Sequence, residues 1–207
     1  MKKLWRKALL WFTRTKIYKW LIIKVIPFIR FTTYYASLRG DAYHEGYALL
    51  EPGDIILTKD KKKLTTLLIG GEWTHAALCV DKVGSWSFLG FEVAEMTHNN
   101  FTRSWFFDVV KEADRVAILR CKDFDPDYIL DAIEKCLTFD KAEYDVEFNL
   151  GVEALYCSEL VYQADFERRL KVSLEDIAGL GTPYISPTGL WRAKNCEVVF
   201  DSGVKGE

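Results

Sequence analysis

Cys157 occupies a position at which a cysteine can become a nucleophile. It stands in the run Tyr-Cys-Ser-Glu-Leu-Val-Tyr over 156–162, and apolar residues at near-helical spacing follow it. We therefore expect Cys157 in the first turn of a helix, where unpaired backbone N–H groups and the helix dipole favour a thiolate over a thiol. The same amides could hold the oxyanion of a tetrahedral intermediate. The competing interpretation is a buried structural cysteine, since free Cys is among the most buried residue types.

A thiolate nucleophile needs a base that accepts and returns its proton, and histidine has a suitable pKa. The chain holds three histidines, His44, His75 and His98. His75 follows a Gly-Gly break at 70–71 and opens an apolar run, which predicts a strand whose first residues face an open edge of the sheet. His44 lies in a polar stretch that we interpret as a surface loop. His75 is therefore the preferred base.

A third polar group would fix the tautomer of the imidazole. Glu92 lies between Phe91 and Val93 on a predicted strand, where an unpaired buried carboxylate would be costly, so it should have a partner. Strand parity places Glu92 on one face and Glu95 on the other, and His98 shares the parity of Glu92. Glu92 is the first candidate, with His98 and Glu95 as alternatives.

Other polar and aromatic residues could line a substrate cleft, and each also has a structural interpretation. These candidates are Asp54, Tyr144, Asp145 and Tyr156. Asp54 follows Gly53 in a turn signal, so it could instead bind nearby backbone groups, and the tyrosines could serve only in packing. Glu159, early in the expected helix, would complement its dipole.

Turn residues and hydrophobic periodicity divide the chain after residue 49 into strands and helices. Strands are predicted at 55–58, 73–81, 87–96, 114–120 and 197–200, and helices at 125–139, 157–170 and 186–191. Pro126 and Pro187 stand where a proline opens a helix. The strands would form an antiparallel sheet packed on the helices, so the expected fold class is α+β.

The first 40 residues differ from the rest in charge. They hold ten Lys and Arg and no acid, which leaves 18 of the 28 basic residues and all 30 acidic residues for the remainder of the chain. Residues 2–14 fit an amphipathic helix, and residues 17–31 are apolar but interrupted by charges and by Pro27. We expect a helical arm over 1–40 and one domain over 41–207. The arm could bind an anionic membrane surface or pack on the domain.

Composition excludes several other classes of protein and site. The five cysteines are scattered and lack metal-ligand spacing with histidine, so neither a disulfide framework nor a metal site is expected, and Cys79, Cys121 and Cys136 are interpreted as packing residues. No cofactor is expected. The basic arm carries no recognised nucleic-acid-binding motif, and no run is long enough to span a bilayer or suited to a secretory signal. The expected location is cytoplasmic, with peripheral membrane association as an alternative.

The ordered motifs over about 49–200 resemble the permuted papain-like hydrolases of the YiiX and YebB type, relatives of NlpC-type peptidases and lecithin:retinol acyltransferases. The motifs are Gly-Asp-Ile-Ile-Leu at 53–57, Thr-His-Ala-Ala at 74–77, Phe-Glu at 91–92, Tyr-Asp at 144–145, Tyr-Cys-Ser-Glu at 156–159 and Ser-Pro at 186–187. The resemblance implies a permuted papain-like fold in which the histidine precedes the cysteine. It implies Cys157 as nucleophile, His75 as general base and acid, and Glu92 as the residue that orients the imidazole.

Three functions are compatible with these features. The first is a cysteine amidase or peptidase that cleaves a peptide or other small amide through an acyl-enzyme intermediate. The second uses the same Cys-His pair on a membrane lipid, as an acyltransferase or acyl hydrolase. The third is a binding or structural module without catalysis.

Overall fold

The computed structural model of the chain describes residues 15–29, 38, 40–60, 71–85, 88–176 and 182–203. The predicted amphipathic helix at 2–14 lies outside these residues. The helices and strands are, in chain order, α2 (Lys16–Lys24), the 3-10 helix η1 (Ile26–Phe28), α3 (Asp41–Leu49), β1 (Ile55–Lys59), β2 (His75–Ser85), β3 (Phe88–Thr97), β4 (Asn100–Trp105), α5 (Phe106–Val110), β5 (Arg115–Cys121), α6 (Pro126–Leu137), β6 (Glu143–Tyr144), β7 (Ala154–Leu155), α7 (Cys157–Ala164), β8 (Glu175–Asp176), β9 (Pro183–Tyr184), α8 (Pro187–Trp191) and β10 (Cys196–Asp201).

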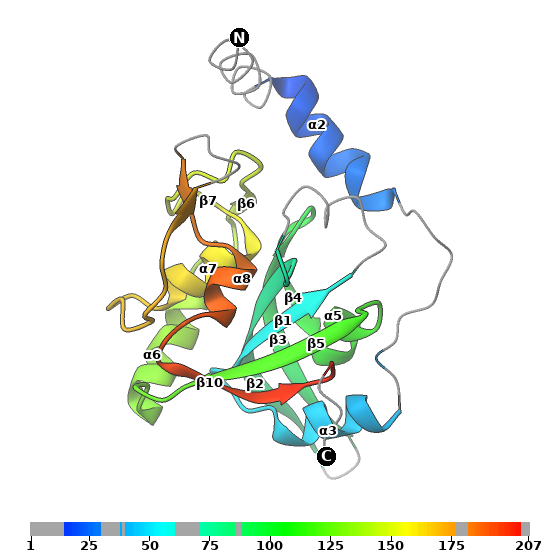
Figure 1. Cartoon of the computed structure of the whole chain (residues 1–207), viewed down its shortest axis with the longest axis vertical. Coiled ribbons are helices and arrows are strands. Elements are labelled where there is room, and N and C mark those ends of the chain that lie inside the picture. The colour runs from blue at the N-terminus through cyan, green and yellow to red at the C-terminus, as the bar shows by residue number, and fades with distance from the viewer. Residues whose placement is uncertain are drawn as a thin grey trace.

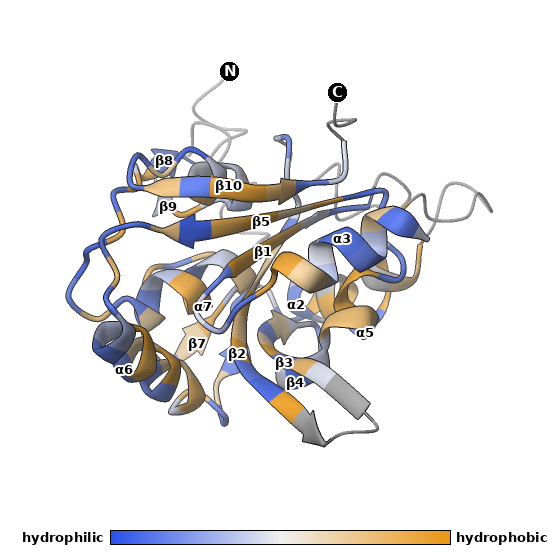
Figure 2. Cartoon of the chain, turned by 90° about the horizontal axis from the view of Figure 1, so that it is seen from below, coloured by the Kyte–Doolittle hydropathy of each residue, from blue (hydrophilic) through white to orange (hydrophobic). Residues whose placement is uncertain are grey.

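A six-stranded antiparallel sheet forms the centre of the domain, in the order β10-β5-β1-β2-β3-β4. Helices α6, α7 and α8 lie on one side of the sheet, and α3 and α5 lie on the other (Figures 1 and 2). The α+β prediction is therefore confirmed.

Alternate residues of the central strands supply two hydrophobic cores, one on each face of the sheet. Ile55, Leu57 and Ala76 belong to the core beneath α6, α7 and α8, which also contains Cys157. Ile56 and Ala77 belong to the core beneath α3 and α5. This alternation is the period-2 pattern of a strand buried on both sides.

Local capping fixes the ends of the helices near the predicted positions. The Asp125 carboxylate accepts the Tyr128 N–H at 2.9 Å, and the Ser186 hydroxyl accepts the Gly189 N–H at 2.7 Å. Both are side-chain N-caps followed by a proline. Gly53 has φ 90° in the turn before β1, where a Cβ would lie 2.6 Å from Ile129, so glycine is required there.

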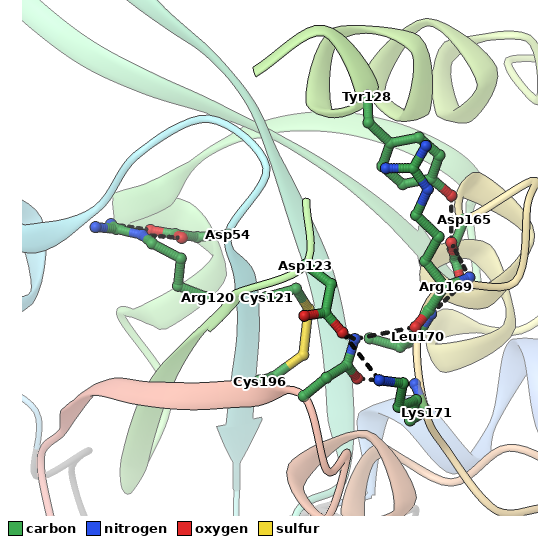
Figure 3. The surroundings of a disulfide bond; sticks show 11 residues. Asp54, Arg120, Cys121, Asp123, Tyr128, Asp165, Arg169, Leu170, Lys171 and Cys196 are labelled. Atoms are coloured by element: carbon green, nitrogen blue, oxygen red, sulfur yellow. Dashed lines mark hydrogen bonds and ion pairs between the residues drawn. A yellow bond between two sulfur atoms is a disulfide. The ribbon is translucent and has the colours of Figure 1, made fainter. Parts of the chain in front are cut away.

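Helix α7 ends at Ala164, whereas the apolar spacing predicted a helix that continues to Leu170. The cause is Asp165, whose carboxylate accepts the N–H groups of Arg169 at 2.9 Å and Leu170 at 2.7 Å and so folds the chain into a turn. The same carboxylate accepts the Tyr128 hydroxyl of α6 (Figure 3). These backbone N–H groups bond to the Asp165 side chain, so the helix does not continue past this point.

The sequence did not predict α3, β4, α5 or the two-residue strands β6, β7, β8 and β9. The polar stretch around His44, interpreted as a loop, is the helix α3, which begins at Asp41. Strand β4 lies at the edge of the sheet and has only exposed and half-buried residues, and five-residue α5 is too short to show a helical period.

One pair of cysteines contradicts the prediction that no disulfide would form. Cys121 and Cys196 face each other on β5 and β10 and are joined in a disulfide (Figure 3). Cys121 is therefore not a free packing thiol. The pairing depends on the register between two strands 75 residues apart in sequence, which spacing alone does not reveal.

Candidate active site

Cys157 is the first residue of α7, as predicted, and both of its neighbours are tied to Ile185. The Tyr156 hydroxyl accepts the Ile185 N–H at 2.9 Å, and the Ser158 hydroxyl donates to the Ile185 carbonyl at 2.7 Å. All of these side chains are buried. The start of the helix is thus held in one position, with the Cys157 sulfur at its N-terminal end.

His75 is the first residue of β2, and the preceding residues fix its position. The Thr188 hydroxyl of α8 accepts the N–H groups of Glu72 and Trp73, each at 3.0 Å. The Thr74 N–H binds the Thr58 carbonyl at 3.1 Å, which brings the chain into the sheet just before the histidine.

His75 and Cys157 form a hydrogen-bonded pair. Burial opposes protonation of the imidazole, but hydrogen bonds and charge from Cys157 and Glu95 outweigh it and raise the pKa of His75 to about 10. Burial would likewise raise the pKa of the Cys157 thiol, but the hydrogen bond and charge of His75, together with backbone N–H groups of Ala76 and Ser158, lower it. The two directions describe one state, a thiolate beside an imidazolium.

Glu95 holds the other side of the imidazole. Its Oε2 lies 2.8 Å from His75 Nε2, so the hydrogen bond with the sulfur falls to Nδ1. Its Oε1 accepts the Ser104 hydroxyl at 2.7 Å. Glu95 is 8% exposed, so the carboxylate acts on the imidazole with little screening by water.

The register of the sheet explains why Glu95 meets His75. Ala77 lies directly opposite Glu95, and paired residues point to the same face, as do residues two apart in a strand. His75 and Glu95 therefore share a face. Val93 lies opposite Ser104, which puts the Ser104 hydroxyl on that face as well.

The expectation that Glu92 orients the imidazole is contradicted by this geometry. Glu92 lies opposite Trp105, has the other parity, and forms an ion pair with Arg103 at the edge of the sheet. Glu92 has a charged partner, as expected, but that partner is the exposed guanidinium of Arg103 and not His75. His98, another alternative, lies in the β3–β4 turn, where its ring contacts Phe28 with the centroids 5.4 Å apart.

Tyr144 is a cleft candidate whose phenol interacts electrostatically with Cys157. Burial first, and then the negative charge of Cys157, raise the pKa of Tyr144 well above its usual value. Its backbone N–H binds the Asn100 side-chain oxygen at 3.1 Å, and strand β6 joins it to Leu155 next to the nucleophile segment. The phenol therefore stays protonated at neutral pH.

The other three cleft candidates have structural roles. The Asp145 carboxylate accepts the N–H groups of Glu147 at 2.7 Å and Asn149 at 2.6 Å, which shapes the loop before β7. Tyr156 is buried and bonded to Ile185. Asp54 lies at the opposite end of β1 from the residue paired with His75, where it forms a two-bond ion pair with Arg120 (Figure 3).

Glu159 does more than complement the helix dipole. It is fully buried, and its Oε1 accepts the Gly151 N–H at 2.6 Å, while no described residue hydrogen-bonds to its Oε2. Gln163 donates to the Gly151 carbonyl at 2.6 Å. The two side chains fasten the loop that leads to Cys157, and burial raises the pKa of Glu159 to about 7.

This raised pKa predicts a pH-dependent stability. In the unfolded chain Glu159 ionises near 4.5, whereas in the folded protein it stays protonated until about 7, so stability is lost as the pH rises between these values. The full loss corresponds to about 3 kcal/mol at pH 8. Glu159→Gln remains neutral and keeps an oxygen for Gly151, so it should be more stable than the wild type at pH 8 but not at pH 4. Urea unfolding at the two pH values measures the difference, and an equal effect at both would contradict the buried-carboxyl interpretation.

No group of three or more His, Cys, Asp or Glu side chains within the described part of the chain is arranged to hold a metal ion. Among the same residues, no helix is both long and apolar enough to cross a membrane.

Comparisons with known proteins bear on the family and the fold of the chain. Residues 49–202 match the family model described as permuted papain-like amidase enzyme, YaeF/YiiX, C92 family. A crystal structure described as metalloprotein YiiX from Escherichia coli O157:H7 superposes with a TM-score of 0.59 at 13% identity, covering 76% of this chain and 97% of that one. No curated protein matches the sequence. The structural likeness supports the fold, and the family model covers both His75 and Cys157.

Proposed function

Because the chain belongs to the C92 family of permuted papain-like amidases, we propose that it is a cysteine hydrolase that cleaves an amide bond with Cys157 as nucleophile. His75 is the general base and acid, and Glu95 is the positioning residue that orients the imidazole. The observation that carries the proposal is the hydrogen-bonded series Cys157, His75 and Glu95. Three separate segments of the chain converge on it, from α7, β2 and β3.

The arrangement supports a two-step reaction. The Cys157 thiolate attacks the carbonyl carbon, and the backbone N–H groups at the start of α7 stabilise the oxyanion. The His75 imidazolium then gives its proton to the amine, the C–N bond breaks, and a thioester remains on the sulfur. Neutral His75 next takes a proton from water, which attacks the thioester and releases the acid. Protonated Tyr144, whose pKa responds to the charge of Cys157, would contact the acyl group.

The state of the thiol gives a test that needs no knowledge of the substrate. Iodoacetamide at pH 6 should alkylate Cys157 at least about tenfold faster than Cys79 and Cys136, because only thiolates react. Burial raises the pKa of both of those thiols, whereas the pKa of Cys157 is lowered by His75. Peptide mapping by mass spectrometry after timed quenching measures the three rates.

His75→Ala provides the matched control for this experiment. Without the imidazolium, only the backbone N–H groups of Ala76 and Ser158 oppose the effect of burial on the thiol, so alkylation of Cys157 at pH 6 should fall toward the rates of the other two cysteines. A wild-type Cys157 that reacts no faster than Cys136 would contradict the proposed activation.

A further inference from the structure

Helix α2 has two different faces. Tyr18 and Leu21 are half-buried, whereas Ile17 and Trp20 are 66% and 58% exposed. Residues three and four apart share a face of a helix, so Ile17, Trp20 and the exposed Lys24 form one stripe. Only one face of the helix is therefore covered by the described part of the protein.

The inner face of α2 is attached close to the candidate active site. Lys19 forms an ion pair of 2.8 Å with Glu147, which lies in the loop shaped by Asp145. Burial raises the pKa of Tyr18. The Tyr18 phenol in turn contributes to the raised pKa of Tyr144, which also responds to the charge of Cys157. Beyond α2, the ring of Phe28 contacts His98 in the β3–β4 turn. Figure 1 shows α2 at the end of the molecule nearest β6 and β7.

The outer face combines large apolar side chains with positive charge. Ile17 and Trp20 are its apolar members, and Lys16 and Lys24, at the two ends of α2, are exposed. The helix carries no acid, and neither does any part of the first 40 residues, which hold ten Lys and Arg. A helix that combines exposed tryptophan and aliphatic side chains with lysines and no acid is typical of helices that lie in the interface of an anionic bilayer.

We propose that the outer face of α2, formed by Ile17, Trp20 and Lys24, docks the protein on an anionic lipid surface. The apolar side chains enter the boundary between headgroups and acyl chains, and the lysines contact the anionic headgroups. Charge complementarity favours an anionic lipid surface as the partner, because Lys16 and Lys24 are exposed and residues 1–40 hold ten Lys and Arg and no acid. The docked helix would hold the Cys157 site next to the bilayer, where an acyl-lipid amide is within reach.

Docking is independent of the hydrolase chemistry and can be tested without it. Full-length protein is sedimented with vesicles of phosphatidylcholine alone and of phosphatidylcholine with 30% phosphatidylglycerol, at about 0.1 M and about 0.5 M salt. We expect binding to the anionic vesicles that weakens at the higher salt. Ile17→Ser with Trp20→Ser should reduce the partition coefficient at least about tenfold, because both apolar anchors are lost.

A matched control removes exposed apolar side chains elsewhere. Leu130 on α6 and Leu174 are 60% and 51% exposed, and α6 lies far from α2 in Figure 1. Leu130→Ser with Leu174→Ser should bind as the wild type does, and Cys157→Ala should also bind fully, which separates docking from catalysis. Circular dichroism melting confirms that each variant is folded.

Protein that does not sediment with anionic vesicles would overturn the proposal. So would an Ile17/Trp20 variant that binds as the wild type does, or a Leu130/Leu174 control that loses as much binding as that variant. A concentration-dependent dimer that the Ile17/Trp20 variant abolishes, without vesicle binding, would assign the face to a second copy of the chain and would also overturn it.

Discussion

Cys157→Ala and His75→Ala should each lower amide hydrolysis by at least about a thousandfold, because each removes a group that bonds to or exchanges protons with the reacting atoms. The probe is a panel of N-acyl p-nitroanilides, with p-nitrophenyl acetate as a more reactive reporter of acyl transfer. In the wild type, a burst of p-nitrophenol should accompany an acetyl group on Cys157, detected by mass spectrometry after acid quench. Cys157→Ala should show neither.

The combined variant sharpens this prediction. Residues that act as one unit have strongly non-additive effects, so Cys157→Ala with His75→Ala should be no slower than either single variant. Cys136→Ala is the matched control, since Cys136 is a free, fully buried cysteine on α6. It should cost stability through lost packing but leave the rate per folded molecule unchanged. Activity that survives Cys157→Ala would disprove the proposed nucleophile.

The sequence predicted the positions of Cys157 and His75 because local signals determine where each of them lies. Cys157 stands where an irregular segment becomes a helix, and His75 stands where a strand begins after a Gly-Gly break. Helix starts and strand starts are encoded by a few neighbouring residues. The resemblance to a family with ordered motifs then joined two segments that lie far apart in sequence.

The third member could not be predicted in the same way. Parity within β3 separates Glu92 from Glu95, but only the register with β2 decides which of them faces His75. That register includes a bulge between Cys79 and Asp81, and bulges leave no clear signal in one sequence. Strand β4, which supplies Ser104, was also not predicted, so the hydroxyl that binds Glu95 could not be used to identify Glu95. The Cys121–Cys196 disulfide was not predicted for the same reason, because it depends on the pairing of two strands 75 residues apart in sequence.

Glu95→Gln should lower kcat by about a hundredfold or more while leaving the fold intact, because the imidazole loses both its tautomer control and its ionic partner. Burial opposes protonation of His75, and the pKa rises to about 10 only because Cys157 and Glu95 outweigh it. Removing the carboxylate charge therefore lowers that pKa. The imidazolium is lost as the pH rises through the pKa of His75, so the alkaline limb of the kcat/KM profile should move to lower pH. A purely structural role for Glu95 would lower the rate without moving the limb.

Glu92→Gln is the matched control, since it makes the same substitution on the same strand three residues away. Glu92 pairs with Arg103, which is half-exposed, and a surface ion pair contributes about 1 kcal/mol or less to stability. Its kcat should stay within about twofold of the wild type, and the alkaline limb should not move. Ser104→Ala should fall between the two variants, because Glu95 keeps its charge but loses the hydroxyl that bonds its Oε1 at 2.7 Å. If Glu92→Gln proved the slower of the two glutamate variants, the imidazole would be oriented by a different carboxylate during turnover, and the Glu95 assignment would be wrong.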